Sequence, residues 1–102
     1  MELITKEIEE KLKSHPLDST ADQGVVDVLV KFYNPFGRGT WYVFEGEKFG
    51  EDWEFFGLVN LFTTELGYFT LSELEAIRRQ FCGIERDPNF NKKYNYKTGE
   101  FE

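Results

Sequence analysis

The stretch WEFFGLVNLF, residues 53–62, decides the fold. In an extended chain, Phe55 and Gly57 lie on one face and Phe56 and Leu58 on the other. Both faces are largely apolar, which is typical of a strand that is covered on each side. Gly57 has no side chain to pack, so it marks either a bulge or a close aromatic neighbour. We therefore predict a central strand with other elements packed against both of its faces.

Further strands are predicted on either side of this central strand. The segments 25–33 (VVDVLVKFY) and 40–46 (TWYVFEG) are rich in β-branched and aromatic residues, and the Pro- and Gly-containing turn 34–39 joins them as an antiparallel hairpin. Residues 46–52 are polar and are expected to form a loop. A short fourth strand, or an extended turn, is expected over 63–68.

Two helices are predicted, one near each end of the chain. Residues 3–14 carry apolar side chains at spacings of four, and Pro16 ends that pattern. Thr70 and Glu73 have the spacing of a capping box, which predicts a second helix over 71–82. The expected fold class is α+β, with an antiparallel sheet of three to four strands and these two helices.

Length and composition set further limits. A chain of 102 residues is expected to form a single domain, 1–102, with 91–102 as a frayed polar tail. The formal net charge of −7 argues against nucleic acid as a direct ligand.

The single cysteine, Cys82, is consistent with a reducing compartment and is expected to be a buried, unreactive thiol. We find no secretory signal and no apolar run long enough to cross a membrane, so a cytoplasmic location is expected.

Several motifs occur together in this order: VKFYNP, TWYVFE, FFGLV, ELGYFTLSEL and GIERD. In combination they resemble a family of small domains of unknown function found in plasmids, phages and other mobile elements. The resemblance covers Val25 to Phe90 and leaves the first predicted helix outside. It implies a fold and a genomic setting, and it brings no established activity.

The candidate binding residues are acidic and aromatic side chains, with one arginine, in or near these motifs. Carboxylates around 45–54, together with exposed Trp and Tyr rings, suit a protein partner with a basic surface. One group within the set is either a site or a structural network: Glu65, Tyr68, Glu85, Arg86 and Asp87. The full set is Trp41, Tyr42, Glu45, Glu47, Asp52, Glu65, Tyr68, Glu85, Arg86 and Asp87.

The function predicted from these features is non-enzymatic binding to a protein, in one version as an inhibitor of a host nucleic-acid-handling protein. One alternative is a small carboxylate-based hydrolase or accessory enzyme using Glu65, Glu85 and Asp87. Another is a binder of single-stranded nucleic acid through the sheet aromatics. We predict no catalytic residue, no cofactor and no metal site, because His15 is the only histidine. A monomer and a homodimer both remain open.

Overall fold

The computed structural model describes residues 2–81 and 83–102 of the chain, and these residues form two helices and two antiparallel sheets. None of the described helices is long and apolar enough to cross a membrane. The elements are α1 (Lys6–Lys13), β1 (Val25–Asp27), β2 (Val30–Tyr33), β3 (Thr40–Phe49), β4 (Asp52–Asn60), β5 (Thr64–Thr70), α2 (Leu71–Phe81), β6 (Glu85–Arg86), β7 (Lys93–Asn95) and β8 (Glu100–Phe101).

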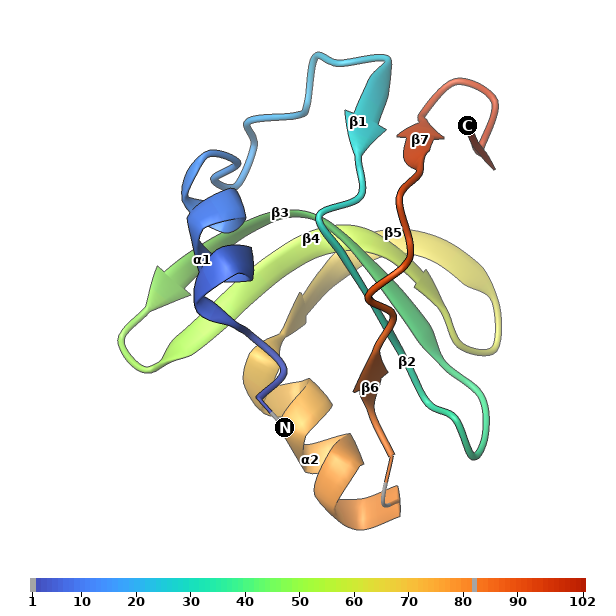
Figure 1. Cartoon of the computed structure of the whole chain (residues 1–102). Helices are drawn as coiled ribbons and strands as arrows, with labels where there is room; N and C mark the ends of the chain where they lie inside the picture. The colour runs from blue at the N-terminus through green and yellow to red at the C-terminus, as the bar shows by residue number, and fades with distance from the viewer. Residues whose placement is uncertain (1, 82) are drawn as a thin grey trace.

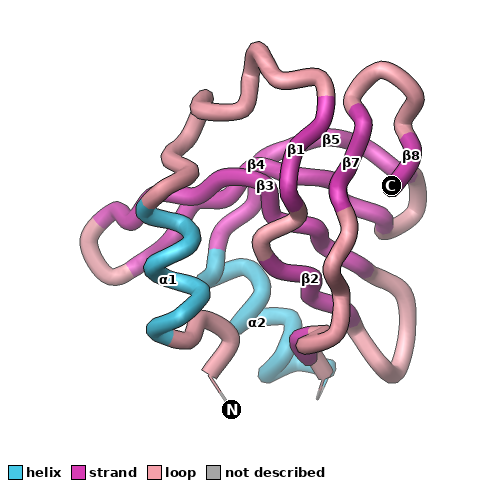
Figure 2. Tube along the Cα trace, turned by 45° about the horizontal axis from the view of Figure 1, so that its top comes forward, coloured by secondary structure: helices cyan, strands magenta, loops and turns pink. Residues whose placement is uncertain are grey.

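The elements are arranged in three layers (Figures 1 and 2). The middle layer is a five-stranded sheet in the order β5-β4-β3-β2-β6. The three-stranded sheet β1-β7-β8 lies over one face of it, and α1 and α2 lie on the other side. We call these the small-sheet face and the helix face of the five-stranded sheet.

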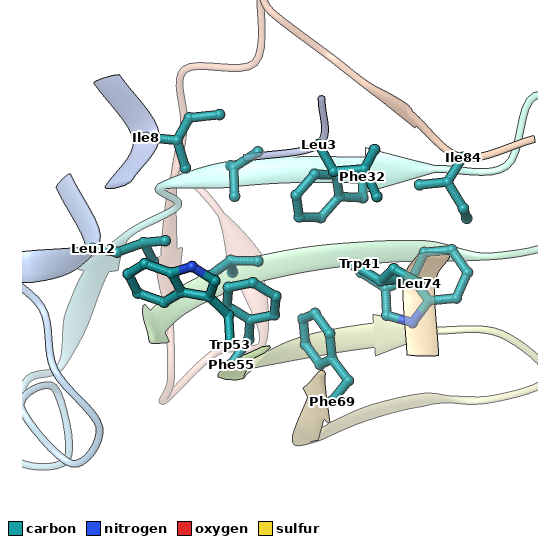
Figure 3. Packing of buried hydrophobic residues seen from close by; sticks show 12 residues of the cluster. Leu3, Ile8, Leu12, Phe32, Trp41, Trp53, Phe55, Phe69, Leu74 and Ile84 are labelled. Atoms are coloured by element: carbon teal, nitrogen blue, oxygen red, sulfur yellow. The ribbon is translucent and has the colours of Figure 1, made fainter. Parts of the chain in front are cut away.

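The larger core lies on the helix face (Figure 3). Phe32, Phe55 and Phe69 come from β2, β4 and β5, and Leu12 and Leu74 reach them from α1 and α2. Successive aromatic rings are in contact here, with the centroids of Phe32 and Phe55 6.4 Å apart and those of Phe55 and Phe69 5.5 Å apart. Burial of these large rings supplies much of the apolar area that drives folding.

The small-sheet face holds a second, aromatic core. Phe44 is fully buried and stacks on Tyr94 of β7, with ring centroids 5.2 Å apart. Val26 and Leu58 complete the buried part of this cluster. The prediction of a central strand covered on both faces is therefore confirmed: Phe55 of β4 points into the helix-face core, and Leu58 into this one.

The prediction of one strand over 25–33 is wrong, because this segment contains two strands that belong to different sheets. Val26 of β1 packs in the small-sheet core, whereas Phe32 of β2 packs in the helix-face core. The chain changes layer between them, where Val28 N–H donates to Lys92 O and Leu29 N–H donates to Val43 O. A regular alternation of apolar residues cannot reveal that they face two different layers.

The polar loop predicted over 46–52 is also wrong. β3 continues to Phe49 and β4 begins at Asp52, so that the strands form one long hairpin. Gly50 has a φ of +63°, the left-handed conformation that a tight turn needs. The polarity of this segment reflects a strand end that extends into water.

The frayed tail predicted over 91–102 is instead part of the small sheet. β7 pairs with β1, and β8 pairs with β7. Tyr94 and Phe101 give the segment its apolar anchors, with ring centroids 5.4 Å apart. The sheet of three to four strands is thus corrected to two sheets of five and three strands, and the α+β class stands.

The second helix, α2, begins at Leu71, as the capping pattern predicted. Thr70 Oγ1 accepts a hydrogen bond of 3.1 Å from Glu73 N–H, so Thr70 caps α2. The first helix is shorter than the predicted 3–14: Thr5 caps it, and Leu3 is buried ahead of it. The prediction for Cys82 lies outside the described residues.

A β-bulge interrupts the pairing of β3 with β4. Val43 lies opposite Gly57 and Glu45 lies opposite Phe56, so Phe44 is the extra residue. A Cβ atom placed on Gly57 would lie 1.7 Å from the carbonyl oxygen of Tyr42. Of the two alternatives predicted for Gly57, a bulge is present, although its extra residue lies on the partner strand β3. The close neighbour of Gly57 is the β3 backbone and not an aromatic ring, and this approach requires glycine.

Replacement of this glycine tests the close approach. We expect Gly57→Ala to lower the free energy of unfolding by at least about 2 kcal/mol, because the backbone of β3 must move away. Gly67→Ala is the matched control: Gly67 lies opposite Gly57 on β5, and nothing lies within 4 Å of its added Cβ. Urea unfolding of both variants makes the comparison, and equal stability of the two would contradict the role of the bulge.

Candidate functional site

Glu45 is the most unusual charged residue of the described chain, because it is only 2 % exposed. Its Oε1 accepts a hydrogen bond of 2.8 Å from Asp18 N–H, and its Oε2 accepts one of 2.8 Å from Thr20 N–H. The Thr20 hydroxyl also donates to Oε2. Three donors therefore compensate the desolvation of this carboxylate.

The network continues to the C-terminal part of the chain. Thr20 Oγ1 lies 3.1 Å from Tyr96 Oη, so one hydroxyl links Glu45 of β3 to the residue after β7. The pKa of Tyr96 is raised, chiefly by burial and further by the negative charge of Glu45, although the hydrogen bond with Thr20 lowers it. Tyr96 is therefore a neutral phenol at physiological pH.

A pocket of about 230 Å³ opens beside this network. It lies between the loop that precedes β1, the small-sheet face at β3 to β5, and Tyr96. We call it the Glu45 pocket, and its principal lining residues are Asp18, Gln23, Glu45, Phe56, Tyr68 and Tyr96. It combines carboxylates with aromatic rings, a set suited to an organic cation.

Glu47 accepts a hydrogen bond from the same loop, between α1 and β1, that Glu45 binds. Its Oε1 accepts a hydrogen bond of 3.1 Å from Leu17 N–H, and Gly46 N–H donates to His15 O at 3.0 Å. Glu45 and Glu47 thus fasten the loop between α1 and β1 to strand β3. These two carboxylates, expected at a binding surface, are hydrogen-bonded to the protein's own backbone.

Asp52 caps the second helix together with Thr70. Its Oδ2 accepts a hydrogen bond of 2.7 Å from the Ser72 hydroxyl, and its Oδ1 accepts from the N–H groups of Ser72 and Trp53. The pKa of Asp52 is lowered, first by the hydroxyl of Ser72 and also by these N–H groups. The carboxylate therefore has a structural role at the start of α2.

The predicted group of Glu65, Tyr68, Glu85, Arg86 and Asp87 is divided between the two edges of the five-stranded sheet. Glu65 and Tyr68 belong to β5 at one edge, and Glu85 and Arg86 to β6 at the other. The structure therefore does not bring Glu65 together with Glu85 and Asp87. The geometry required by the carboxylate-based hydrolase alternative is absent from the described residues.

Arg86 and Asp87 hold neighbouring segments in place. Arg86 Nη1 donates to Glu2 O at 3.0 Å and to Leu3 O at 3.2 Å, which fixes the chain ahead of α1. Asp87 forms an ion pair with Lys31, with 3.8 Å between Oδ2 and Nζ. The GIERD motif thus ties β6 to the N-terminal segment and to β2.

The predicted aromatic surface is largely interior. Trp41 is 4 % exposed and packs under the helices, and Phe44 and Trp53 are buried as well. Tyr42 is half-buried against Phe101, with ring centroids 4.6 Å apart. The sheet aromatics therefore form no continuous stacking platform in the described chain. Among the predicted rings, Tyr68 is the one that stands well clear of the core, at 59 % exposed.

Metal ligation has no support in residues 2–81 and 83–102, which contain no group of three or more His, Cys, Asp or Glu side chains placed to hold an ion.

Sequence reasoning found Glu45 and Tyr68 but missed the pocket they share. Asp18 and Thr20 lie in the loop between α1 and β1, and Tyr96 lies in the segment that was expected to fray. No sequence signal marks their convergence, because it depends on the docking of both segments onto β3.

Removal of the Glu45 carboxylate tests its structural role. We expect Glu45→Ala to lower the free energy of unfolding by about 3 kcal/mol, because the buried donors of Asp18 and Thr20 lose their acceptor. Urea unfolding measures the loss, and amide hydrogen exchange at Asp18 and Thr20 should accelerate. Glu54→Ala is the control: Glu54 lies opposite Glu47 on β4, and its removal should change stability by less than about 0.5 kcal/mol.

The lowered pKa of Asp52 predicts a pH dependence of stability. Because the folded state favours the ionised form, Asp52 stabilises the protein fully at pH values above its ordinary pKa, and this contribution disappears as the pH falls through the lowered value. At pH 7, Asp52→Asn should cost about 1 kcal/mol, because hydrogen bonds to a charged acceptor are stronger than those to a neutral amide. The difference from wild type should vanish once the pH has fallen below the lowered pKa of Asp52.

Thermal unfolding from pH 2 to pH 7 measures this dependence. Glu51→Gln is the control, since Glu51 is an exposed neighbour in the β3–β4 turn. A stability difference for Asp52→Asn that persists unchanged at pH 2 would contradict the assignment.

Comparison with known proteins identifies the family of this chain. No curated protein and no solved structure matches the chain. Residues 3–97 match a family described as "Protein of unknown function (DUF2958)". The match takes in α1 and β7, so it extends beyond the Val25–Phe90 region of the motif resemblance at both ends. Because it covers nearly all of the chain, the protein belongs to this family of unknown function, DUF2958.

Proposed function

We propose that this chain is a protein-binding module that recruits its partner along strand β5. The observation that carries the proposal is the position of β5 at the end of the five-stranded sheet. One side of β5 pairs with β4 over seven residue pairs, and no described strand pairs with its other side. Such an edge offers backbone N–H and C=O groups to an added strand.

The side chains of β5 favour the same interpretation. Leu66 and Tyr68 lie opposite Leu58 and Phe56 on the small-sheet face, but the small sheet does not cover them. They are 45 % and 59 % exposed, which is unusual for neighbouring large side chains on one strand. We call this surface the β5 patch: the free edge of β5 with Leu66 and Tyr68.

Charge indicates the kind of partner. The chain has a net charge of −7, and Glu65 is exposed on β5 itself. A basic, extended segment of another protein suits such a surface better than a second copy of this chain, which would bring a like charge. The opposite edge, β6, has only two residues and offers little room for an added strand.

The proposal also includes the genomic and cellular context in which the partner is met. The motif resemblance implies a mobile element, so we expect the partner among the cytoplasmic proteins of the host or of the element. Inhibition of a nucleic-acid-handling protein is one version, because such proteins carry basic surfaces. In this version the contact is made by the β5 patch. Glu47 and Asp52, which were also candidates for this contact, accept internal hydrogen bonds.

The test begins with affinity purification from host cells and continues with the purified partner. We expect Leu66→Lys with Tyr68→Lys to weaken binding by tenfold or more in calorimetry, since both side chains belong to the patch. Amide exchange across 64–70 should slow when the partner binds, because strand addition protects the outer edge of β5.

Phe49→Ser is the matched control, since Phe49 is another exposed aromatic residue, 56 % exposed, at the far end of β3. Its binding should equal that of wild type. Full binding by the β5 double variant, with unchanged exchange over 64–70, would contradict the proposal. Light scattering on wild type alone would detect self-pairing of β5.

A further inference from the structure

We infer that the Glu45 pocket receives one cationic side chain, a lysine or an arginine, from the partner. This inference rests on the proposed function and names the chemistry of its recognition. The pocket and the β5 patch share Tyr68, so a segment added to β5 passes the mouth of the pocket. A long side chain that leaves the added segment on the small-sheet face would pass Tyr68, which lines the pocket.

The charge of the pocket is the first argument. The ion pairs of the described residues are Lys13–Glu10, Lys31–Asp87, Arg78–Glu75 and Lys93–Asp27. Glu45 is buried, accepts hydrogen bonds from three donors, and belongs to none of these pairs. Asp18 adds a second carboxylate to the lining. Both carboxylates line the pocket, and no ion pair of the described residues neutralises Glu45, so the pocket is negatively charged and favours a cationic group.

The aromatic wall is the second argument, and it is independent of the first. Phe56 and Tyr68 lie opposite each other on β4 and β5, with ring centroids 5.0 Å apart and an interplanar angle of 55°. Tyr96 supplies a third ring. Aromatic faces beside carboxylates attract ammonium and guanidinium groups and also contact the methylene groups that carry them.

The size of the pocket sets the class of ligand. Its volume of about 230 Å³ is below the range of roughly 300–1,000 Å³ that is typical of drug-sized ligand sites. One long side chain fits this space. A divalent metal ion would require more oxygen ligands than Glu45 and Asp18 provide, and two oxygens of Glu45 already accept hydrogen bonds.

The test uses small probes and the full chain, without the partner. In an NMR titration of the ¹⁵N-labelled protein, we expect Nα-acetyl-lysine methylamide and its arginine analogue to shift the amides of Asp18, Thr20 and Tyr68 saturably. The norleucine analogue, which has a similar length and no charge, should cause little shift. Equal shifts by the norleucine and lysine probes, or no shift by any probe, would overturn the inference.

Variants then assign the site. Asp18→Asn removes one charge, and asparagine tolerates the φ of +71° at this position. Tyr68→Leu removes an exposed ring. Each should weaken binding of the lysine probe about two- to fivefold, whereas Phe49→Ser should leave it unchanged. Unchanged binding in both pocket variants would overturn the assignment.

The two proposals fail in distinguishable ways. Leu66→Lys alone separates them, because Leu66 belongs to the β5 patch and does not line the pocket. Probe binding by wild type together with full partner binding by Leu66→Lys would overturn the β5 surface and leave the cation pocket in place. Spermidine is titrated as a further probe. Spermidine binding tenfold tighter than that of the lysine and arginine probes would assign the pocket to free polyamines and overturn the side-chain inference.

Discussion

The bulge at Phe44 is the constraint on which the rest of this structure depends. Along β3, Trp41 and Val43 point toward the helices, and an unbroken alternation would place Glu45 among them. The extra residue moves Glu45 to the small-sheet face and brings Gly46 under Leu12 instead. One irregularity thus keeps a carboxylate out of the larger core and supplies the acid of the pocket.

The same irregularity determines how the loop ahead of β1 is held. That loop is polar and buries little apolar area of its own, so its position depends on hydrogen bonds. Glu45 and Glu47 both face it after the bulge, and together they accept from the backbone of Leu17, Asp18 and Thr20. Carboxylates suit this task because they accept several N–H groups at once and form stronger hydrogen bonds than neutral acceptors do.

The two edges of the five-stranded sheet differ in a way that bears on function. At β6 the strand is short, and Arg86 and Asp87 bind it to its surroundings. At β5 the strand is longer and presents Leu66 and Tyr68 to water. Natural sheets usually protect a long edge with charge, proline or a covering segment. The exposed Leu66 and Tyr68 on this longer edge are therefore the basis of the proposed partner site.

Much of the architecture could be predicted from local patterns. The apolar faces of WEFFGLVNLF indicated a central strand, and Thr70 and Glu73 indicated the start of α2. Gly57 indicated either a bulge or a close aromatic neighbour. These features depend on side-chain periodicity, capping and the lack of a Cβ, all of which act between near neighbours. The α+β class follows from them.

The sequence by itself therefore determined the central strand and the capped helix, and it marked Gly57 as an irregular position, whereas the approach of the β3 backbone that requires glycine there is tertiary. Only the tertiary structure decided that 25–33 divides between two sheets, that 91–102 completes the smaller one, and that Asp18, Thr20 and Tyr96 meet at Glu45. The physical reason is that these outcomes depend on contacts between segments far apart in the chain. Two strands with the same alternation can face different layers, and a polar segment becomes ordered only where distant groups satisfy its hydrogen bonds.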